Sequence, residues 1–212
     1  MEDITLRALR ILGEVDVVLA EDTRVTGKLL ARHTITAQLK SYHQQSSERV
    51  ANQIIELISE GKTLALVTDA GTPSVADPGN ELIARIVDAL PDVRIEPIPG
   101  ASSLTAALSV CGFPTNEFVF LGFLPHKKGR QTLLNEITEI SRTTVLFESP
   151  HRIGKLLGEL EERMPERNVV VLRELTKLHE SHYRGTVSEI LSQYNEKVIP
   201  EKGEFVVVLG AW

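Results

Sequence analysis

Short apolar runs alternate along the chain with segments whose apolar residues recur at helical spacing. The apolar runs predict β-strands at residues 15–20, 63–67, 93–98, 118–124, 143–147, 168–172 and 205–209. Helical spacing predicts α-helices at residues 4–12, 23–32, 47–59, 81–90, 104–110, 129–141, 153–163 and 186–194. This alternation predicts an α/β fold in which a mostly parallel sheet carries helices on both faces.

Capping residues mark the ends of some of these helices. Asp3 is placed to cap the first helix, and Thr186 with Glu189 forms the pattern of a capping box before the last one. The chain therefore opens on a helix, whereas a parallel α/β domain usually opens on a strand and a glycine-rich turn.

Three loop-forming residues cluster near the middle of the chain, namely Gly112, Pro114 and Asn116. They predict a linker at residues 112–117. We therefore expect two α/β domains of near-equal size, at residues 1–113 and 117–212.

The amino-acid composition indicates an ordinary globular protein and disfavours a membrane protein or a metal-binding protein. The 212 residues are 42% hydrophobic and 25% charged, which is ordinary for a soluble globular protein. We find no run of the roughly 20 apolar residues that a membrane span needs and no signal peptide, so we expect a cytoplasmic protein with no membrane partner. Cys111 is the single cysteine, and His179 with His182 lacks a third ligand, so no metal site is expected. Because the net charge is −6, contacts to phosphates would need a local basic patch.

The segment at residues 68–79, T-D-A-G-T-P-S-V-A-D-P-G, follows a predicted buried strand and precedes a helix. Ligands of open α/β sheets bind where loops turn over the carboxyl ends of strands. Gly71 permits close approach of a ligand or a positive φ, and Pro73 and Pro78 fix the path of the loop. A tight connection with Asp77 capping the next helix is the alternative reading.

Polar residues also follow three other predicted strands, at residues 21–24, 99–103 and 148–152. If these strand ends converge, they form a cleft for a small molecule. Each also suits a helix N-terminus, because acids and serines are favourable there. The basic loop at residues 126–130 suits either a phosphate contact or a solvated turn. The sequence lacks the P-loop, the G-x-G-x-x-G dinucleotide fingerprint and the G-x-S-x-G elbow, which disfavours those three classes of enzyme.

Motifs spread over nearly the whole chain resemble those of the tetrapyrrole methylase superfamily of S-adenosylmethionine-dependent methyltransferases. More closely, the chain resembles the ribosomal RNA small subunit methyltransferase I branch, which methylates a cytidine 2′-hydroxyl in 16S rRNA. The matching segments are D-I-T-L-R-A-L at 3–9, A-E-D-T-R at 20–24, S-Y-H at 41–43, the loop at 68–79, P-G-A-S-S at 99–103, G-F-L-P at 122–125, F-E-S-P-H-R at 147–152, R-E-L-T-K at 173–177 and K-G-E-F-V-V-V at 202–208.

The resemblance implies two α/β domains, the second with a mixed sheet, a homodimer, and S-adenosylmethionine bound between the domains. By position, the residues lining this cofactor would be Asp69, Ala70, Gly71, Thr72, Val75, Ala101 and Ser102, faced by Phe147 and Glu148 from the second domain. The implied partner is 16S rRNA or the small ribosomal subunit. For its phosphates and the rim of the site we expect contacts from Arg24, Lys127, Lys128, Arg130, Arg152 and Lys177.

The chain departs from the family pattern in two places. Family members carry a further strand and a P-I-G-N-L-type turn before D-I-T, where this sequence has only Met1 and Glu2, so we expect the first strand to be missing. The segment after S-Y-H reads Q-Q-S-S, where the family favours His and Asn.

Thr72 distinguishes between substrates. Tetrapyrrole-modifying members typically carry G-D-P where this chain has Gly71, Thr72 and Pro73, so the sequence favours RNA. The alternatives are a methyltransferase acting on a tetrapyrrole or another small molecule, and an inactive RNA-binding or assembly protein. For the chemistry, Glu148 and His151 are the candidate catalytic residues, with Glu174 as a further candidate, because a ribose hydroxyl needs a base or an electrostatic aid.

Overall fold

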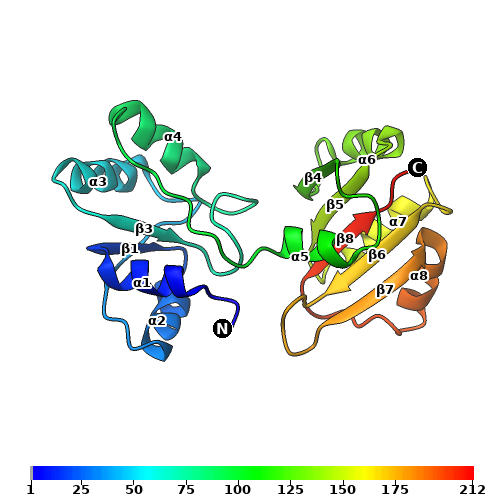
Figure 1. Ribbon diagram of the computed structural model, residues 1–212. Coiled ribbons are helices and arrows are strands. Elements are labelled where there is room, and N and C mark those ends of the chain that lie inside the picture. Colours follow the sequence, from blue (N-terminus) through cyan, green and yellow to red (C-terminus); the bar gives the residue numbers. More distant parts are fainter. Residues whose placement is uncertain (1) are drawn as a thin grey trace. The chain divides into compact units, whose positions relative to one another are not determined.

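The computed structural model describes residues 2–212 and separates into two compact units (Figure 1). The first unit extends to Ser102, and the second runs from Ser103 to Trp212. The described residues form eight α-helices and eight β-strands, so the predicted α/β class is confirmed. Among these residues, no helix has the length and apolar character needed to cross a membrane.

The first unit contains a three-stranded parallel sheet in the order β2-β1-β3. Its elements are α1 (Leu6–Glu14), β1 (Val17–Ala20), α2 (Thr23–Arg32), β2 (Gln38–Ser41), α3 (Glu48–Ser59), β3 (Leu64–Val67) and α4 (Asn80–Ala89). Alternation along β1 divides the core: Val17 and Leu19 pack with residues of α3 and α4, while Val18 packs with Leu12 of α1 and Leu30 of α2. Helices therefore cover both faces of this sheet, as predicted (Figure 1).

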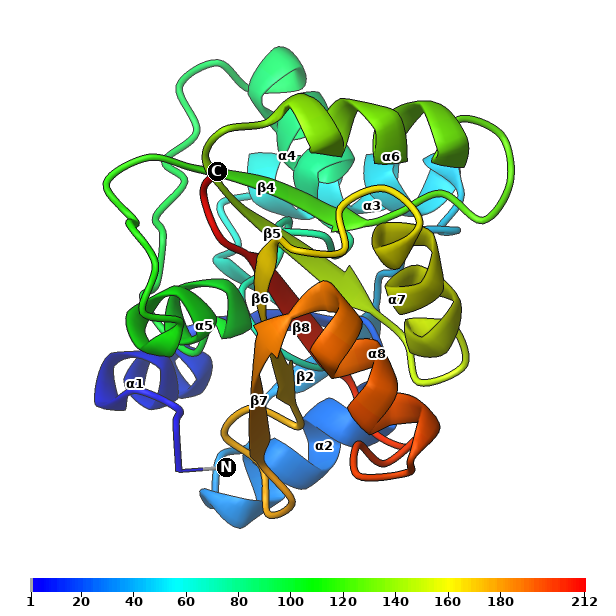
Figure 2. The same ribbon diagram turned by 90° about the vertical axis from the view of Figure 1, so that its right-hand side faces the viewer.

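The second unit contains a five-stranded sheet in the order β4-β5-β8-β6-β7. Its elements are α5 (Ser103–Val110), β4 (Phe118–Phe123), α6 (Arg130–Glu139), β5 (Thr143–Glu148), α7 (Ile153–Glu161), β6 (Asn168–Arg173), β7 (Ser181–Thr186), α8 (Val187–Asn195) and β8 (Phe205–Leu209). Only β4 and β5 pair in parallel, so the expected mixed sheet is confirmed. Helices α6, α7 and α8 pack on one face, in front of the sheet in Figure 2, and α5 packs on the other.

A register shift interrupts β4 between Phe120 and Gly122. Gly122 has a φ of 60°, a conformation that suits glycine, and the residue between them is the extra one of a β-bulge. As a result, Phe120 and Phe123 both contact the ring of Phe147 on β5, with centroid distances of 4.9 and 5.7 Å. These rings lie at the carboxyl end of the parallel pair.

The structure corrects two local predictions and confirms a third. Residues 93–98 form no strand, because Pro97 and Pro99 lack the N–H groups that a ladder needs. The N-cap of α1 is Thr5 instead of Asp3, since the Thr5 side chain accepts a hydrogen bond from the Ala8 N–H at 3.1 Å. The capping box of α8 is confirmed, with Thr186 and Glu189 in both reciprocal contacts.

The two units divide at Ser102 and Ser103, earlier in the chain than the predicted linker at residues 112–117. The reason is the packing of α5. Ala107 on this helix and Cys111 just after it are buried against Val145 and Val208 of the second sheet. Helix α5 therefore belongs to the second unit.

Candidate active site

The loop that follows β3, at residues 68–79, has a strongly constrained backbone. Gly71, Ser74, Ala76 and Gly79 all have positive φ angles, of 77°, 71°, 62° and 142°. A Cβ at Gly79 would lie 2.4 Å from Ser74 Oγ and 2.8 Å from Leu66 Cδ2, so only glycine fits there. Gly79 is also the N-cap of α4, in place of the Asp77 cap that the alternative reading required.

The structure brings the two loops of the predicted cofactor site in the first unit together. The Thr72 hydroxyl donates a hydrogen bond to the Ala101 carbonyl at 3.2 Å. The hydroxyl of Thr5, at the start of α1, donates to the Pro99 carbonyl at 3.1 Å. Residues 69–72 and 75 are exposed, as is Ala101, while Ser102 is half-buried. No atom lies within 4 Å of a Cβ built on Gly71 or on Gly100, so space is open beside both loops.

Carboxylates couple the turn after β1 to the turn after β3. The Thr68 hydroxyl donates to Glu21 Oε2 at 2.7 Å, and the backbone N–H of Asp22 donates to Asp69 Oδ1 at 3.3 Å. Although the residue is exposed, reduced solvation of its carboxyl, followed by the nearby charges of Glu21 and Asp22, raises the pKa of Asp69. By contrast, hydrogen bonds from Arg24 lower the pKa of Asp22 to about 2. This edge of the sheet therefore offers acceptors for cationic or hydroxyl groups.

Glu148, at the end of β5, is at the centre of a buried ionic network. Its residue exposure is 1%, and its Oε2 accepts a hydrogen bond from Arg152 Nη2 at 2.9 Å. Its Oε1 accepts from the backbone N–H of Ser149 at 2.8 Å, while Arg130 Nη1 lies 3.9 Å from Oε2. Arg130 in turn bonds to Glu159, with Nη2 and Oε2 separated by 2.6 Å. The Glu148 carboxylate therefore has its partners inside the protein.

This burial changes the roles that the sequence suggested. Arg130 is only 2% exposed and paired with Glu159, so we withdraw it from the residues expected to contact RNA phosphates. Arg152 is mostly covered as well, and it donates to the Leu124 carbonyl at 2.7 Å. The Glu159 partner was missed because a glutamate beside the apolar stripe of α7 is expected to face solvent, and its burial depends on Arg130 from another segment.

The remaining predicted RNA contacts differ in their surroundings. Lys127 and Lys128 are exposed in the loop before α6, and His151 is exposed in the turn before α7. Arg24 is exposed but hydrogen-bonded to Asp22. Lys177 bonds to Glu174 at 3.0 Å and to Glu204 at 2.9 Å, so its charge is neutralised locally.

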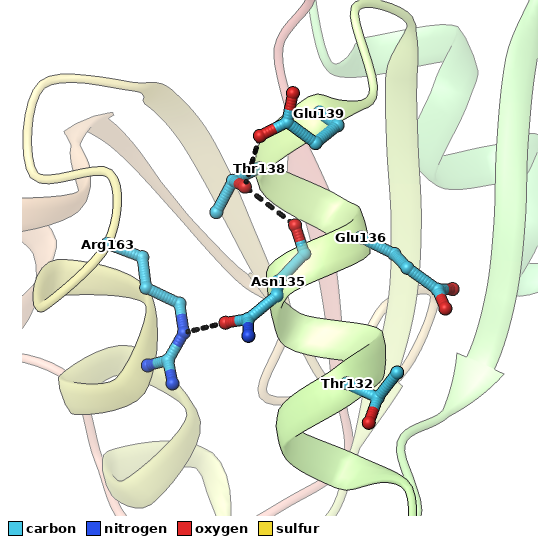
Figure 3. Close-up of a pocket in the computed structure, with 6 residues that line it drawn as sticks. All are labelled: Thr132, Asn135, Glu136, Thr138, Glu139 and Arg163. Atoms are coloured by element: carbon cyan, nitrogen blue, oxygen red, sulfur yellow. Dashed lines mark hydrogen bonds between the residues drawn. The ribbon is translucent and has the colours of Figure 1, made fainter.

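A surface hollow in the second unit lies apart from these residues. It is lined by Thr132, Asn135, Glu136, Thr138, Glu139 and Arg163 (Figure 3). Within it, Arg163 Nε donates to Asn135 Oδ1 at 3.1 Å, and Thr138 Oγ1 donates to the Asn135 carbonyl at 2.6 Å. None of the predicted site residues lines this hollow.

Comparison with known proteins identifies the family. Residues 1–191 match the family model described as tetrapyrrole (corrin/porphyrin) methylases. The chain belongs to the tetrapyrrole (corrin/porphyrin) methylase family. Among curated members, a protein of Thermotoga maritima named ribosomal RNA small subunit methyltransferase I is 42% identical over 99% of this chain and 92% of its own length. Proteins of the same name from Halalkalibacterium halodurans and Neisseria meningitidis are 42% and 41% identical, over 99% of this chain and 71% and 72% of their own lengths.

Solved structures of methylases share the fold. The methyltransferase CobJ matches with a TM-score of 0.69 at 18% identity, covering 100% of this chain and 90% of that protein. The uroporphyrin-III-C-methyltransferase of Thermus thermophilus matches with a TM-score of 0.65 at 25% identity, covering 99% and 88%. The expected membership of the tetrapyrrole methylases, and the resemblance to the ribosomal RNA small subunit methyltransferase I branch, are thus confirmed.

Proposed function

We propose that this methylase transfers a methyl group from S-adenosylmethionine to the 2′-hydroxyl of a cytidine in 16S rRNA. The observation that carries the proposal is the set of curated relatives at about 40% identity over nearly the full chain, which are named ribosomal RNA small subunit methyltransferase I. Thr72 supports the same substrate, because an acid is typical at this position in members that act on tetrapyrroles.

The first unit suits the cofactor chemically. S-adenosylmethionine supplies an electrophilic methyl group and also carries an ammonium group, a carboxylate and ribose hydroxyls. Asp69 offers a carboxylate for the cationic or hydroxyl groups, and the open space beside Gly71 and Gly100 leaves room against the backbone. Thr72 and Ala101 hold the two loops in one arrangement. We expect Ala70, Val75 and Ser102 to complete the binding surface that the first unit offers.

His151 is the candidate that we retain for activating the ribose hydroxyl, because Glu148 is buried and Glu174 is held by Lys177 and the Glu204 N–H. Methyl transfer requires the hydroxyl to lie in line with the methyl carbon, at about 3–3.5 Å. A base must reach the hydroxyl proton, and an exposed imidazole at the carboxyl end of β5 can do so. Glu148 instead acts as a positioning residue: its carboxylate holds the Ser149 N–H and Arg152, and so fixes the turn that carries His151.

The decisive experiment incubates the full chain with methyl-labelled S-adenosylmethionine and either naked 16S rRNA or assembled small subunits, and then maps the label. We expect label on one cytidine 2′-hydroxyl in at least one of the two substrates. Absence of transfer to both would refute the proposal. Parallel incubation with a porphyrinogen tests the tetrapyrrole alternative. Binding of the RNA without calorimetric binding of the cofactor would instead favour an inactive RNA-binding or assembly protein.

Two variants separate the roles within the site. His151→Ala should lower kcat with little change in the KM for the cofactor, because the base touches only the hydroxyl. Glu148→Gln should lower activity less and keep the pH profile of the wild type, since it acts through geometry. If both Glu148→Ala and His151→Ala retain full transfer, this assignment of residues is wrong.

We further propose that the protein is cytoplasmic and forms a homodimer. Sedimentation would test the dimer.

A further inference from the structure

An exposed aromatic ring stands at the carboxyl end of β4, beside a basic loop. Phe123 is 54% exposed, although its ring contacts Phe147 edge-on at 5.7 Å. The next residue, Leu124, is buried at 1%, and residues 125–129 are then exposed, including His126, Lys127 and Lys128. A large exposed phenylalanine costs solubility and is not needed to fill this core.

Two arginines brace this loop from inside. Arg152 Nη2 donates to the Leu124 carbonyl at 2.7 Å, and Arg130 Nη1 donates to the Pro125 carbonyl at 3.2 Å. Both arginines belong to the buried network of Glu148 and Glu159. The backbone between Phe123 and Lys127 is therefore held by charged groups that are themselves paired, so its exposed side chains are presented on a fixed frame.

The charge of this loop contrasts with that of the chain. The protein carries a net charge of −6, yet Lys127 and Lys128 are adjacent, exposed and without a carboxylate partner among the ion pairs of residues 2–212. An aromatic face next to fixed positive charge is the combination that binds single-stranded nucleic acid, because bases stack on the ring and phosphates bind the cations.

We propose that Phe123 stacks on an unpaired base of the RNA substrate while Lys127 and Lys128 bind the phosphates beside that base. The choice of RNA as the ligand rests on the proposed function. Phe123 acts in recognition, and it takes no part in the chemical step. Arg130 and Arg152 are positioning residues that set the distance between the ring and the two ammonium groups.

Phe118 provides a matched control for the ring. It lies on the same strand, is 41% exposed, and stands at the opposite, amino end of β4. We would measure binding of a single-stranded RNA 12-mer that contains one pyrrolo-cytidine, using anisotropy for affinity and fluorescence quenching for stacking, without methyl donor. Phe123→Ala should weaken binding about tenfold and abolish the quenching. Phe118→Ala should change neither, and Phe123→Tyr should restore both.

The salt dependence tests the lysines separately. Removing two phosphate contacts by Lys127→Ala with Lys128→Ala should reduce the slope of log K against log salt by about 1.4. The control is a double variant of two lysines in the first unit, Lys28→Ala with Lys62→Ala. It removes the same formal charge and should leave the slope unchanged.

The proposal is overturned if the wild type does not bind the 12-mer, or if Phe123→Ala and Phe118→Ala bind it equally and quench equally. These outcomes can be told apart from failure of the proposed function. Binding that depends on Phe123, without methyl transfer to any RNA, would refute only the enzymatic proposal. Transfer to 16S rRNA that is indifferent to Phe123 would refute only this one.

Discussion

Arg167 is a buried cation that has no carboxylate partner among residues 2–212, and its removal should destabilise the second unit. The residue is 1% exposed, and burial lowers the pKa of its guanidinium. Its nitrogens donate to four backbone carbonyls: Gly210 at 2.8 Å, Ile137 at 2.9 Å, Ile140 at 2.9 Å and Arg142 at 3.3 Å. It therefore ties the C-terminal end of α6 to the end of β8.

These contacts set the loss of stability that we expect for Arg167→Met. The four carbonyls lose their donor in this variant, and each unpaired acceptor costs about 1 kcal/mol. About 1–2 kcal/mol is regained, because a guanidinium no longer has to be desolvated. We therefore expect the free energy of unfolding to fall by about 2–3 kcal/mol.

Trp212 provides the assay, since it is the one tryptophan of the chain and its ring centroid lies 5.1 Å from the Arg167 guanidinium carbon. Urea unfolding followed by its fluorescence should show a lower midpoint for Arg167→Met. The control is Arg142→Met, which removes an exposed ion pair with Glu117 and should cost less than about 1 kcal/mol. Equal destabilisation by the two variants would refute the reasoning.

Three further predictions concern single residues. Thr72→Val removes the hydroxyl that joins the two cofactor loops, so the KM for S-adenosylmethionine should rise up to about tenfold, whereas Thr132→Val should leave it unchanged. Gly79→Ala should destabilise the first unit, because its Cβ would overlap Ser74, while Gly13→Ala in open space should stabilise α1 by about 0.5–1 kcal/mol; a reversed order in thermal melts would contradict this. Burial acts to raise the pKa of Glu159, but its hydrogen bond and ion pair with Arg130 outweigh burial and lower the pKa of this carboxyl below its usual range. The stability from Glu159 is thus fully present above the unfolded pKa of about 4.3 and is lost as the pH falls through the lowered folded pKa. A Glu159→Gln variant with the same acid-unfolding profile as wild type would count against this assignment.

The sequence predicted the strands that consist mainly of apolar residues. The runs that became β5, β6 and β8 are apolar because both sheet faces are covered. Strands β2 and β7 were missed because they read Q-L-K-S and S-H-Y-R-G-T, and none of their residues is fully buried. Both lie at an edge of their sheet. The edge strands β3 and β4 were predicted all the same, because their sequences L-A-L-V and F-V-F-L-G-F are apolar.

The sequence predicted which residues belong to the candidate site, but it did not predict which side chains they contact. The loops around Thr72 and Ala101 were expected to belong together, and a hydrogen bond joins them. Glu148 was expected to act in catalysis because a ribose hydroxyl needs a base or an electrostatic aid. Its burial against Arg152 and Arg130 depends on contacts with residues on two other segments, which no local pattern encodes.

The bulge in β4 makes the length of that strand as important as its composition. Side chains of a strand alternate between faces, so one added or removed residue exchanges the faces of everything after it. In β4 the bulge takes up Leu121, so Phe120 and Phe123 lie on the same face, against Phe147. If Leu121 were instead paired in the ladder and the bulge closed, Phe123 would turn toward the helices on the opposite face, although every aromatic residue would be retained. The exposed ring of Phe123 therefore owes its position to one extra residue in the strand.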